Sequence, residues 1–529
     1  MCKPFNVLLF VLFVGRCVCL IEDQAYWRQL GKEELSKALK KRKISNQAQN
    51  LILFVGDGMG LTTSTVARIY GKGESGRLAW ETFDNLGVLK IYSANKLVPD
   101  SCSTATAMFT GIKANHKTAG VDSTVAVDDC AASRKKPAQV ESFINWAQTA
   151  GKATGFVTTT RVTHATPSAL YAHTPNRSWE CEANIPQDAA DCDDIAWQLV
   201  NNSPGRNIDV IMGGGRQCLQ ANVEGSPEDP VDTWSCYSKQ QGRDLINDWK
   251  TDKEIRQSSY QVLQNNLDLQ NMNESAEFTL GIFANGHLKL EHERDKGPEG
   301  MPSLADMTAA AIRLLSKKNP NGYVLMVEGG NIDQTHHRGH ARKALDETVA
   351  LSDAVDVALN MTDVTNTLII VTSDHSHSMV FTGYPDRSQG VLGVSNSKMD
   401  NVPYTNLLYG TGGPNNYQFV VEENKVKRPD PTAENITDFE YSQQSVVLND
   451  EVTHSGTDVL VYARGPMAHL FNSVHEQSYV AYAISYAMQI GIFEGLDPFD
   501  DEDSGSSHIY GMSLSFLIML PFIGVFRVI

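Results

Sequence analysis

Short, strongly apolar runs recur along the chain, and several end directly in Gly, Asp or Arg. Between them lie longer segments in which apolar residues return with helical spacing, at 140–150, 304–317 and 342–359. Apolar strands that alternate with helices are typical of an α/β fold with a mainly parallel central β-sheet covered by helices on both faces. The strands predicted in this way are 51–55, 155–158, 208–212, 323–327, 368–372 and 459–462.

Polar side chains follow three of these predicted strands directly. Asp57 comes after the first strand, Glu328 after strand 323–327, and Asp374 and His375 after strand 368–372. Ligands of parallel sheets collect beyond the carboxyl ends of the strands. We therefore expect these residues, distant in sequence, to converge at one edge of the sheet.

The pattern changes on either side of the predicted sheet. Residues 33–43 predict a charged amphipathic helix within an N-terminal arm, 20–48, outside the main sheet. From 381 to 447, Gly, Asn, Tyr and Pro become frequent and helical periodicity fades, which indicates an irregular or small β insertion. The main α/β domain is then formed by 49–380 and 448–495.

The N-terminus has the pattern of a secretory signal. Lys3 precedes an apolar run at 5–14, and the small residues Cys17 and Cys19 fit a cleavage site. We predict a signal peptide, 1–19, cleaved after Cys19. The alternative is a signal anchor retained in the membrane, for which the apolar run is short.

The C-terminus carries a second targeting pattern. An acidic, then small-residue linker at 496–507 is followed by an almost wholly apolar run at 512–526. Small residues, a polar spacer and a hydrophobic end resemble a glycosylphosphatidylinositol (GPI) attachment signal, with attachment at Ser504 and removal of 508–529. A C-terminal membrane helix is the alternative, and Pro521 and Arg527 weigh against it.

Charge and cysteine content narrow the possible functions. Of 529 residues, 45 are basic and 62 acidic, giving a formal net charge of −17. A nucleic-acid-binding face would have to be basic, and any phosphate site must carry its own positive charge from metal ions and an arginine. Six cysteines lie outside the signal peptide, and an exported chain would pair most of them. Glycosylation sequons, which also fit export, stand at Asn176, Asn201, Asn273, Asn360 and Asn435.

Two short motifs offer metal ligands. Asp333 and His337 are four residues apart, so on a helix they share a face and could bind one ion. An exposed pair with this spacing is also a common surface feature, but two glycines after Glu328 would let the backbone approach a ligand closely. Asp374 and His375 are neighbours, with His377 two residues later, and could equally be a satisfied polar strand end.

Asp57 and Ser101 each allow two interpretations. Asp57 lies between glycines and could bridge two ions or cap the next helix. Ser101 would open a helix in a small, Thr-rich stretch, where backbone N–H groups favour an anion. It could be a helix cap, or a hydroxyl nucleophile placed among metal ligands for hydrolysis of a phosphate monoester.

Taken together, these residues resemble the alkaline phosphatases, in their animal, membrane-anchored form, over about 27–492. The segments that carry the resemblance are Asp57-Gly58-Met59-Gly60, Pro99-Asp100-Ser101, Thr104-Ala105-Thr106-Ala107, Thr158 to Pro167, Ala172-His173-Thr174 with Asn176-Arg177, Val327-Glu328-Gly329-Gly330, Asp374-His375-Ser376-His377 and Thr453-His454.

The resemblance implies a phosphate monoester hydrolase that forms a phosphoserine on Ser101, has a broad substrate range and uses two Zn²⁺ and one Mg²⁺. It implies a homodimer at the outer face of the plasma membrane, with the insertion as a crown domain, and a disulfide between Cys130 and Cys192. The implied site comprises Asp333, His337 and His454 for one zinc, Asp57, Asp374 and His375 for the other, Asp57, Thr166 and Glu328 for magnesium, Arg177 for phosphate, His164 beside the magnesium and Glu451 in the pocket.

Several points depart from the family or stay open. Cys102 stands beside the predicted nucleophile, either as a buried thiol or paired elsewhere, and local pairing of Cys218 with Cys236 is our hypothesis. A sulfatase relative would need a Cys-x-Pro-x-Arg setting and a phosphodiesterase typically a threonine nucleophile; the chain shows neither. A catalytically inactive surface binding protein of the same fold would be expected to have lost some of the ligand set, which is whole.

Overall fold

The computed structural model describes residues 24–40, 42–413 and 420–495. The predicted signal peptide, Ser504 and the hydrophobic C-terminal segment lie outside these ranges. None of the helices within them combines the length and apolar composition needed to cross a membrane.

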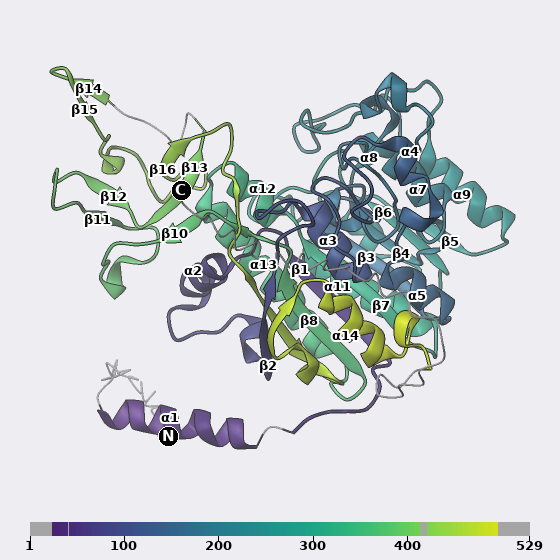
Figure 1. Cartoon of the computed structure of the whole chain (residues 1–529), viewed down its shortest axis with the longest axis horizontal. Helices are drawn as coiled ribbons and strands as arrows, with labels where there is room; N and C mark the ends of the chain where they lie inside the picture. The colour runs from purple at the N-terminus through teal and green to yellow at the C-terminus, as the bar shows by residue number, and fades with distance from the viewer. Residues whose placement is uncertain (1–23, 41, 414–419, 496–529) are drawn as a thin grey trace, which may run out of the picture.

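A ten-stranded sheet forms the centre of the molecule (Figure 1). Its strand order is β19-β2-β18-β8-β1-β7-β3-β4-β6-β5, and only β18 runs against the others, pairing antiparallel with β2 and β8. The mainly parallel sheet expected from the sequence is confirmed. The strands are β1 Asn50–Gly56, β2 Asn85–Lys90, β3 Ala153–Arg161, β4 Val210–Gly214, β5 Tyr260–Leu263, β6 Phe278–Ile282, β7 Tyr323–Gly329, β8 Thr367–Ser373, β18 Val459–Arg464 and β19 Ser473–Glu476.

Alternating side chains of the central strands pack into two separate hydrophobic cores, one on each face of the sheet. In β1, Leu51 and Leu53 point to one face and Ile52 and Phe54 to the other, and all are fully buried. Because both faces are covered, the strands consist of continuous apolar runs. The first face is covered by α3 Ser101–Thr110, α5 Phe143–Thr149, α7 Ile195–Asn201, α9 Leu245–Ile255 and α14 Tyr479–Met488, and the second by α11 Leu304–Lys318 and α13 Ala341–Met361.

The segment between β9, Ser376–His377, and β17, His454–Ser455, is built of short strands and lies to one side of the sheet (Figure 1). Its central strand β13, Leu407–Gly412, lies between β10 Met379–Phe381 and β16 Ser445–Leu448. Leu407 and Tyr409 pack with α13 and with α2, Leu61–Lys72, in a third apolar cluster. The insertion is therefore anchored to helices of the main domain.

The N-terminal helix differs from the prediction for 33–43. Helix α1 spans Gln24–Leu39, so it begins earlier and ends before the basic residues that follow. It lies apart from the sheet, as expected for the arm (Figure 1).

The cysteine pairing corrects one hypothesis. Cys181, not Cys218, pairs with Cys236, with Cα atoms 5.8 Å apart. Cys218 lies on the neighbouring α8, Arg216–Leu219, where its sulfur faces the Cys236 carbonyl and remains a buried free thiol, as does Cys102. A second disulfide joins Cys130 and Cys192.

Candidate metal centre

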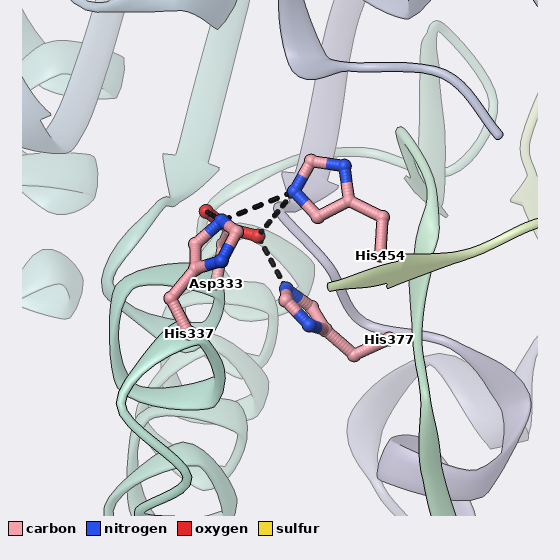
Figure 2. A group of neighbouring side chains, drawn as sticks. All are labelled: Asp333, His337, His377 and His454. Atoms are coloured by element: carbon pink, nitrogen blue, oxygen red, sulfur yellow. Dashed lines mark hydrogen bonds and ion pairs between the residues drawn. The ribbon is translucent and has the colours of Figure 1, made fainter. Parts of the chain in front are cut away.

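Three groups of acidic and imidazole side chains gather where the parallel strands end. The first consists of Asp333, His337, His377 and His454 (Figure 2). Asp333 and His337 lie one turn apart on α12, Asn331–His337, with His337 Nε2 3.2 Å from Asp333 Oδ2. Asp333 Oδ1 lies 3.3 Å from His454 Nε2 and 2.5 Å from His377 Nε2. One cation could bind several of these atoms at once.

Backbone carbonyls fix the orientation of two of these imidazoles. His337 Nδ1 lies 2.8 Å from the Val452 carbonyl and His454 Nδ1 2.9 Å from the Pro99 carbonyl. Since a carbonyl can only accept, each Nδ1 carries a proton, and Nε2 is the atom that faces Asp333. Metal-binding histidines normally have such a hydrogen bond on the ring nitrogen that does not bind the metal.

The reversed strand β18 explains how His454 reaches the group. His454 precedes β18, whereas Asp57 and Asp374 follow parallel strands. Because β18 runs in the opposite direction, its amino end lies at the edge where its neighbours end. His454 is held there by pairing of β17, His454–Ser455, with β9, Ser376–His377.

Asp57, Asp374 and His375 form the second group and are fully buried. His375 Nε2 lies 3.1 Å from Asp374 Oδ2 and 3.5 Å from Asp57 Oδ1. The backbone N–H groups of Gly58 and His375 both donate to Asp374 Oδ1. Gly58 has φ +69°, and a Cβ there would lie 2.6 Å from the His377 ring, so this turn requires glycine.

Asp57 also belongs to the third group, with His164 and Glu328. Glu328 Oε2 accepts a 2.5 Å hydrogen bond from Thr158. The predicted ligand Thr166 is fully buried and its hydroxyl has no well-formed hydrogen bond. Asp57 therefore belongs to two of the three groups, and its carboxylate has two oxygens.

Buried oxygens without partners show that cations fit these groups. Both Asp57 oxygens are buried and accept no hydrogen bond from the described residues, and the buried Asp374 Oδ2 faces the His375 ring nitrogen at 3.1 Å. Burial raises the pKa of Glu328 to about 7 and that of Asp374 to about 6. Unpaired buried carboxylates are costly, and metal ions would satisfy them. The site is therefore that of a metal-dependent protein.

Ser101 lies at the start of α3 beside the second group. It is fully buried, and its Oγ lies 3.2 Å from His375 Nε2. Asp100 caps the helix: its carboxylate accepts hydrogen bonds from the Ser103 hydroxyl at 2.8 Å and the Lys117 backbone N–H at 2.9 Å. The cap leaves the Ser101 hydroxyl free to face the metal groups.

Arg177 is held near Ser101 by two side chains. Its Nη1 lies 3.3 Å from Asp100 Oδ2 and its Nη2 3.3 Å from His164 Nε2. About a quarter of the side chain remains exposed, at 23%. A guanidinium in this position offers a planar fork to an oxyanion entering from solvent.

A buried ion pair supports the segment that follows Arg177. Arg161, at the end of β3, donates to Glu180 through Nε at 2.9 Å and Nη2 at 2.8 Å. This bidentate pair ties the end of a central strand to the chain three residues beyond Arg177. It therefore helps to fix the backbone that carries the predicted phosphate ligand.

The structure brings together the predicted residues and adds others. Glu451 lies at the rim, with Oε2 3.4 Å from His337 Nδ1 and a side chain that is 55% exposed. His377, which the sequence places two residues after the predicted ligand His375 without a role of its own, contacts Asp333 directly. His336, also unassigned, lies behind His377 with ring centroids 4.8 Å apart. Spacing could have drawn attention to both, because His336 adjoins His337 and His377 lies two residues from His375.

Comparison with known proteins identifies the family of the chain. The family model for alkaline phosphatase matches residues 48–490. The chain is 42% identical over 482 residues to the Gallus gallus alkaline phosphatase, tissue-nonspecific isozyme, covering 89% of this chain and 90% of that protein. It is 39% identical to the Homo sapiens tissue-nonspecific isozyme, covering 93% and 94%.

Solved structures show the same fold. The Thermus thermophilus alkaline phosphatase has a TM-score of 0.58 at 21% identity, covering 85% of this chain and 93% of that one. The enzyme from the Antarctic bacterium TAB5 has a TM-score of 0.55 at 22% identity, covering 84% and 99%. With the family match and the close relatives, these findings show that the chain belongs to the alkaline phosphatase family and is a phosphoric monoester hydrolase.

Proposed function

We propose that Ser101 attacks the phosphorus of a phosphate monoester and becomes a phosphoserine, which water then hydrolyses. The observation that carries this proposal is the position of the Ser101 hydroxyl, buried at a helix start and 3.2 Å from His375. Backbone N–H groups at the start of α3 and the Arg177 fork favour the phosphoryl oxygens. Since both contact only the phosphoryl group, many leaving groups would be accepted.

The ligand sets suggest which ions bind. Mixed carboxylate and imidazole groups suit Zn²⁺, so Asp333, His337 and His454 would hold one zinc ion and Asp57, Asp374 and His375 another. The oxygens of Asp57, Thr166 and Glu328 suit Mg²⁺, with His164 beside them. When bound, such cations lower the pKa of a serine hydroxyl and stabilise charge on the leaving oxygen.

The surroundings of the enzyme are part of the same proposal. We place the domain boundaries at 49–380, 381–447 and 448–495 and infer a homodimer joined across the crown, both supported by the family resemblance. The terminal sequence patterns, with the resemblance, support GPI anchoring at Ser504 on the extracellular side of the plasma membrane. Retention of every predicted ligand argues against an inactive binding protein.

Hydrolysis of an aryl phosphate at alkaline pH tests the proposal. The secreted protein should be active, and Ser101→Ala and a chelator-treated sample should lose at least about a thousandfold in kcat, the order expected when a nucleophile or an electrostatic stabiliser is removed. Ser123→Ala, on the exposed surface, is the matched control. Acid-quenched enzyme should yield a peptide phosphorylated at Ser101. Equal rates in all four samples would end the enzymatic proposal.

A further inference from the structure

A cavity lined by several charged side chains lies at the edge of the sheet opposite the metal groups. Its volume is about 280 Å³, and the residues that matter for its chemistry are Arg42, Lys43, Asp84, Asn85, Arg464 and His469. It forms where residues 42–44 of the arm meet the chain that follows β18, with Ile44 O accepting from Met467 N at 2.8 Å.

Strand direction places this cavity far from Ser101. Arg464 ends the reversed strand β18, and Asn85 begins β2. Both positions therefore lie at the edge opposite the one where β1 and β8 deliver Asp57 and Asp374. A ligand bound in the cavity would not contact the catalytic residues.

The charges around the cavity are unbalanced. Arg42, Lys43 and Arg464 contribute +3 and Asp84 contributes −1, so the lining carries +2 in a chain whose formal charge is −17. Asp84 has an interaction of its own, and the ion pairs seen within 42–413 and 420–495 do not include Arg42, Lys43 or Arg464. His469 adds a buried Nδ1 atom that has no hydrogen-bond partner. Such a concentration of unpaired donors favours an anion.

We propose that this cavity binds a small anion through a phosphate or sulfate group. The half-buried Arg464 fork matches two oxygens of a tetrahedral oxyanion. From the arm, Arg42 and Lys43 neutralise the remaining charge of the anion, and the His469 ring nitrogen adds a hydrogen bond. A free phosphate ion and the phosphate of a lipid headgroup share this chemistry.

Calorimetry with inorganic phosphate tests the binding site. To separate the two sites, the titration uses the full secreted chain carrying Arg177→Ala, which weakens phosphate binding at the catalytic centre. The binding event at the cavity is expected to weaken about tenfold or more with Arg464→Gln, since a charge-assisted hydrogen bond contributes about 1.5–3 kcal/mol. Arg464→Lys should retain most of the affinity. The double variant Arg42→Gln, Lys43→Gln alters only exposed side chains and should weaken binding similarly if Arg464→Gln fails to fold.

Two further measurements complete the test. With Arg177 intact, Arg464→Gln should hydrolyse an aryl phosphate at the wild-type rate, which separates this site from the catalytic one. Flotation with phosphatidylcholine vesicles, with and without phosphatidylinositol 4-phosphate, identifies the source: Arg464-dependent vesicle binding indicates a headgroup, and phosphate binding without it indicates a soluble anion. The proposal is overturned if neither probe binds, or if both charge-removing variants bind as tightly as their parent.

Discussion

Tyr409 Oη, on strand β13 of the insertion, lies 2.7 Å from Nδ1 of His336 in helix α12. On the other side of the ring, Thr63 Oγ1 of α2 lies 3.1 Å from Nε2. All three side chains are buried, so both ring nitrogens are satisfied by protein hydroxyls. His336 adjoins His337 on α12, and the insertion thereby helps to position a helix that carries two candidate ligands.

Tyr409→Phe should loosen this helix. The substitution leaves a buried imidazole nitrogen unsatisfied, at a cost of about 1–3 kcal/mol. We expect a lower thermal midpoint and faster release of metal to a chelator, measured with a zinc-sensitive dye. Tyr404→Phe, a half-buried tyrosine in the same insertion, is the control. Identical release rates for wild type and both variants would contradict the inferred coupling.

Asp100 should stabilise α3 chiefly through the hydrogen bonds that its carboxylate oxygen accepts. Asp100→Ala removes Oδ1, which accepts from both the Ser103 hydroxyl and the Lys117 N–H, whereas Asp100→Asn keeps this oxygen and loses only the charge. We expect the alanine variant to be less stable than the asparagine variant by about 1 kcal/mol, the usual contribution of an N-cap. Urea denaturation midpoints at one pH give the comparison. Equal midpoints would show that the cap contributes nothing.

The buried carboxyl of Glu347 should make the folded protein less stable as pH rises. Burial raises the pKa of its carboxyl from 4.5 to about 8, while Oε1 accepts from the Glu291 N–H. Because the folded-state pKa lies above the unfolded value, the contribution is fully present below about pH 4.5 and is lost as pH rises through about 8.

Glu347→Gln keeps the acceptor and removes the ionisation. Its thermal midpoint should rise relative to wild type between about pH 5 and pH 8 and then hold a constant difference. Glu141→Gln, on the surface, should show no such trend. A wild-type midpoint that keeps a constant distance from Glu347→Gln across this range would sink the prediction.

Thiol labelling should separate the six cysteines outside the signal. In the native protein neither Cys102 nor Cys218 should react, because both are buried and burial raises the pKa of each thiol strongly. Unfolded without reductant, only these two should be alkylated, as read by peptide mass spectrometry. Labelling of Cys181 or Cys236 under those conditions would contradict the disulfide that joins them.

Asn176 should remain unglycosylated despite its sequon. Its amide nitrogen donates to Asp128 Oδ1 at 2.6 Å, and its oxygen accepts from the Ser178 N–H. A glycan would break the first contact beside Arg177. Peptide mapping should find Asn176 bare, with the exposed Asn435 as the site to compare. A glycopeptide containing Asn176 would refute this.

The central strands and their polar ends could be predicted because both are local features. Residues such as Leu51 to Val55 are apolar at every position since the sheet is covered on both faces. Asp57, Glu328 and Asp374 could be placed at one edge because parallel strands share a direction. The same reasoning gave no place to His454, which precedes a strand.

The sequence by itself therefore determined the fold class, the residues that offer ligand atoms and the family, because the burial tendency and the chemistry of each side chain follow from the residue at that position. Tertiary structure alone decided that β18 runs backwards and so delivers His454, that Cys181 rather than Cys218 meets Cys236, and that Tyr409 meets His336. An apolar run indicates that a strand is covered, but it identifies neither the neighbouring strand nor the direction of the strand, since hydrophobic burial has no directional preference.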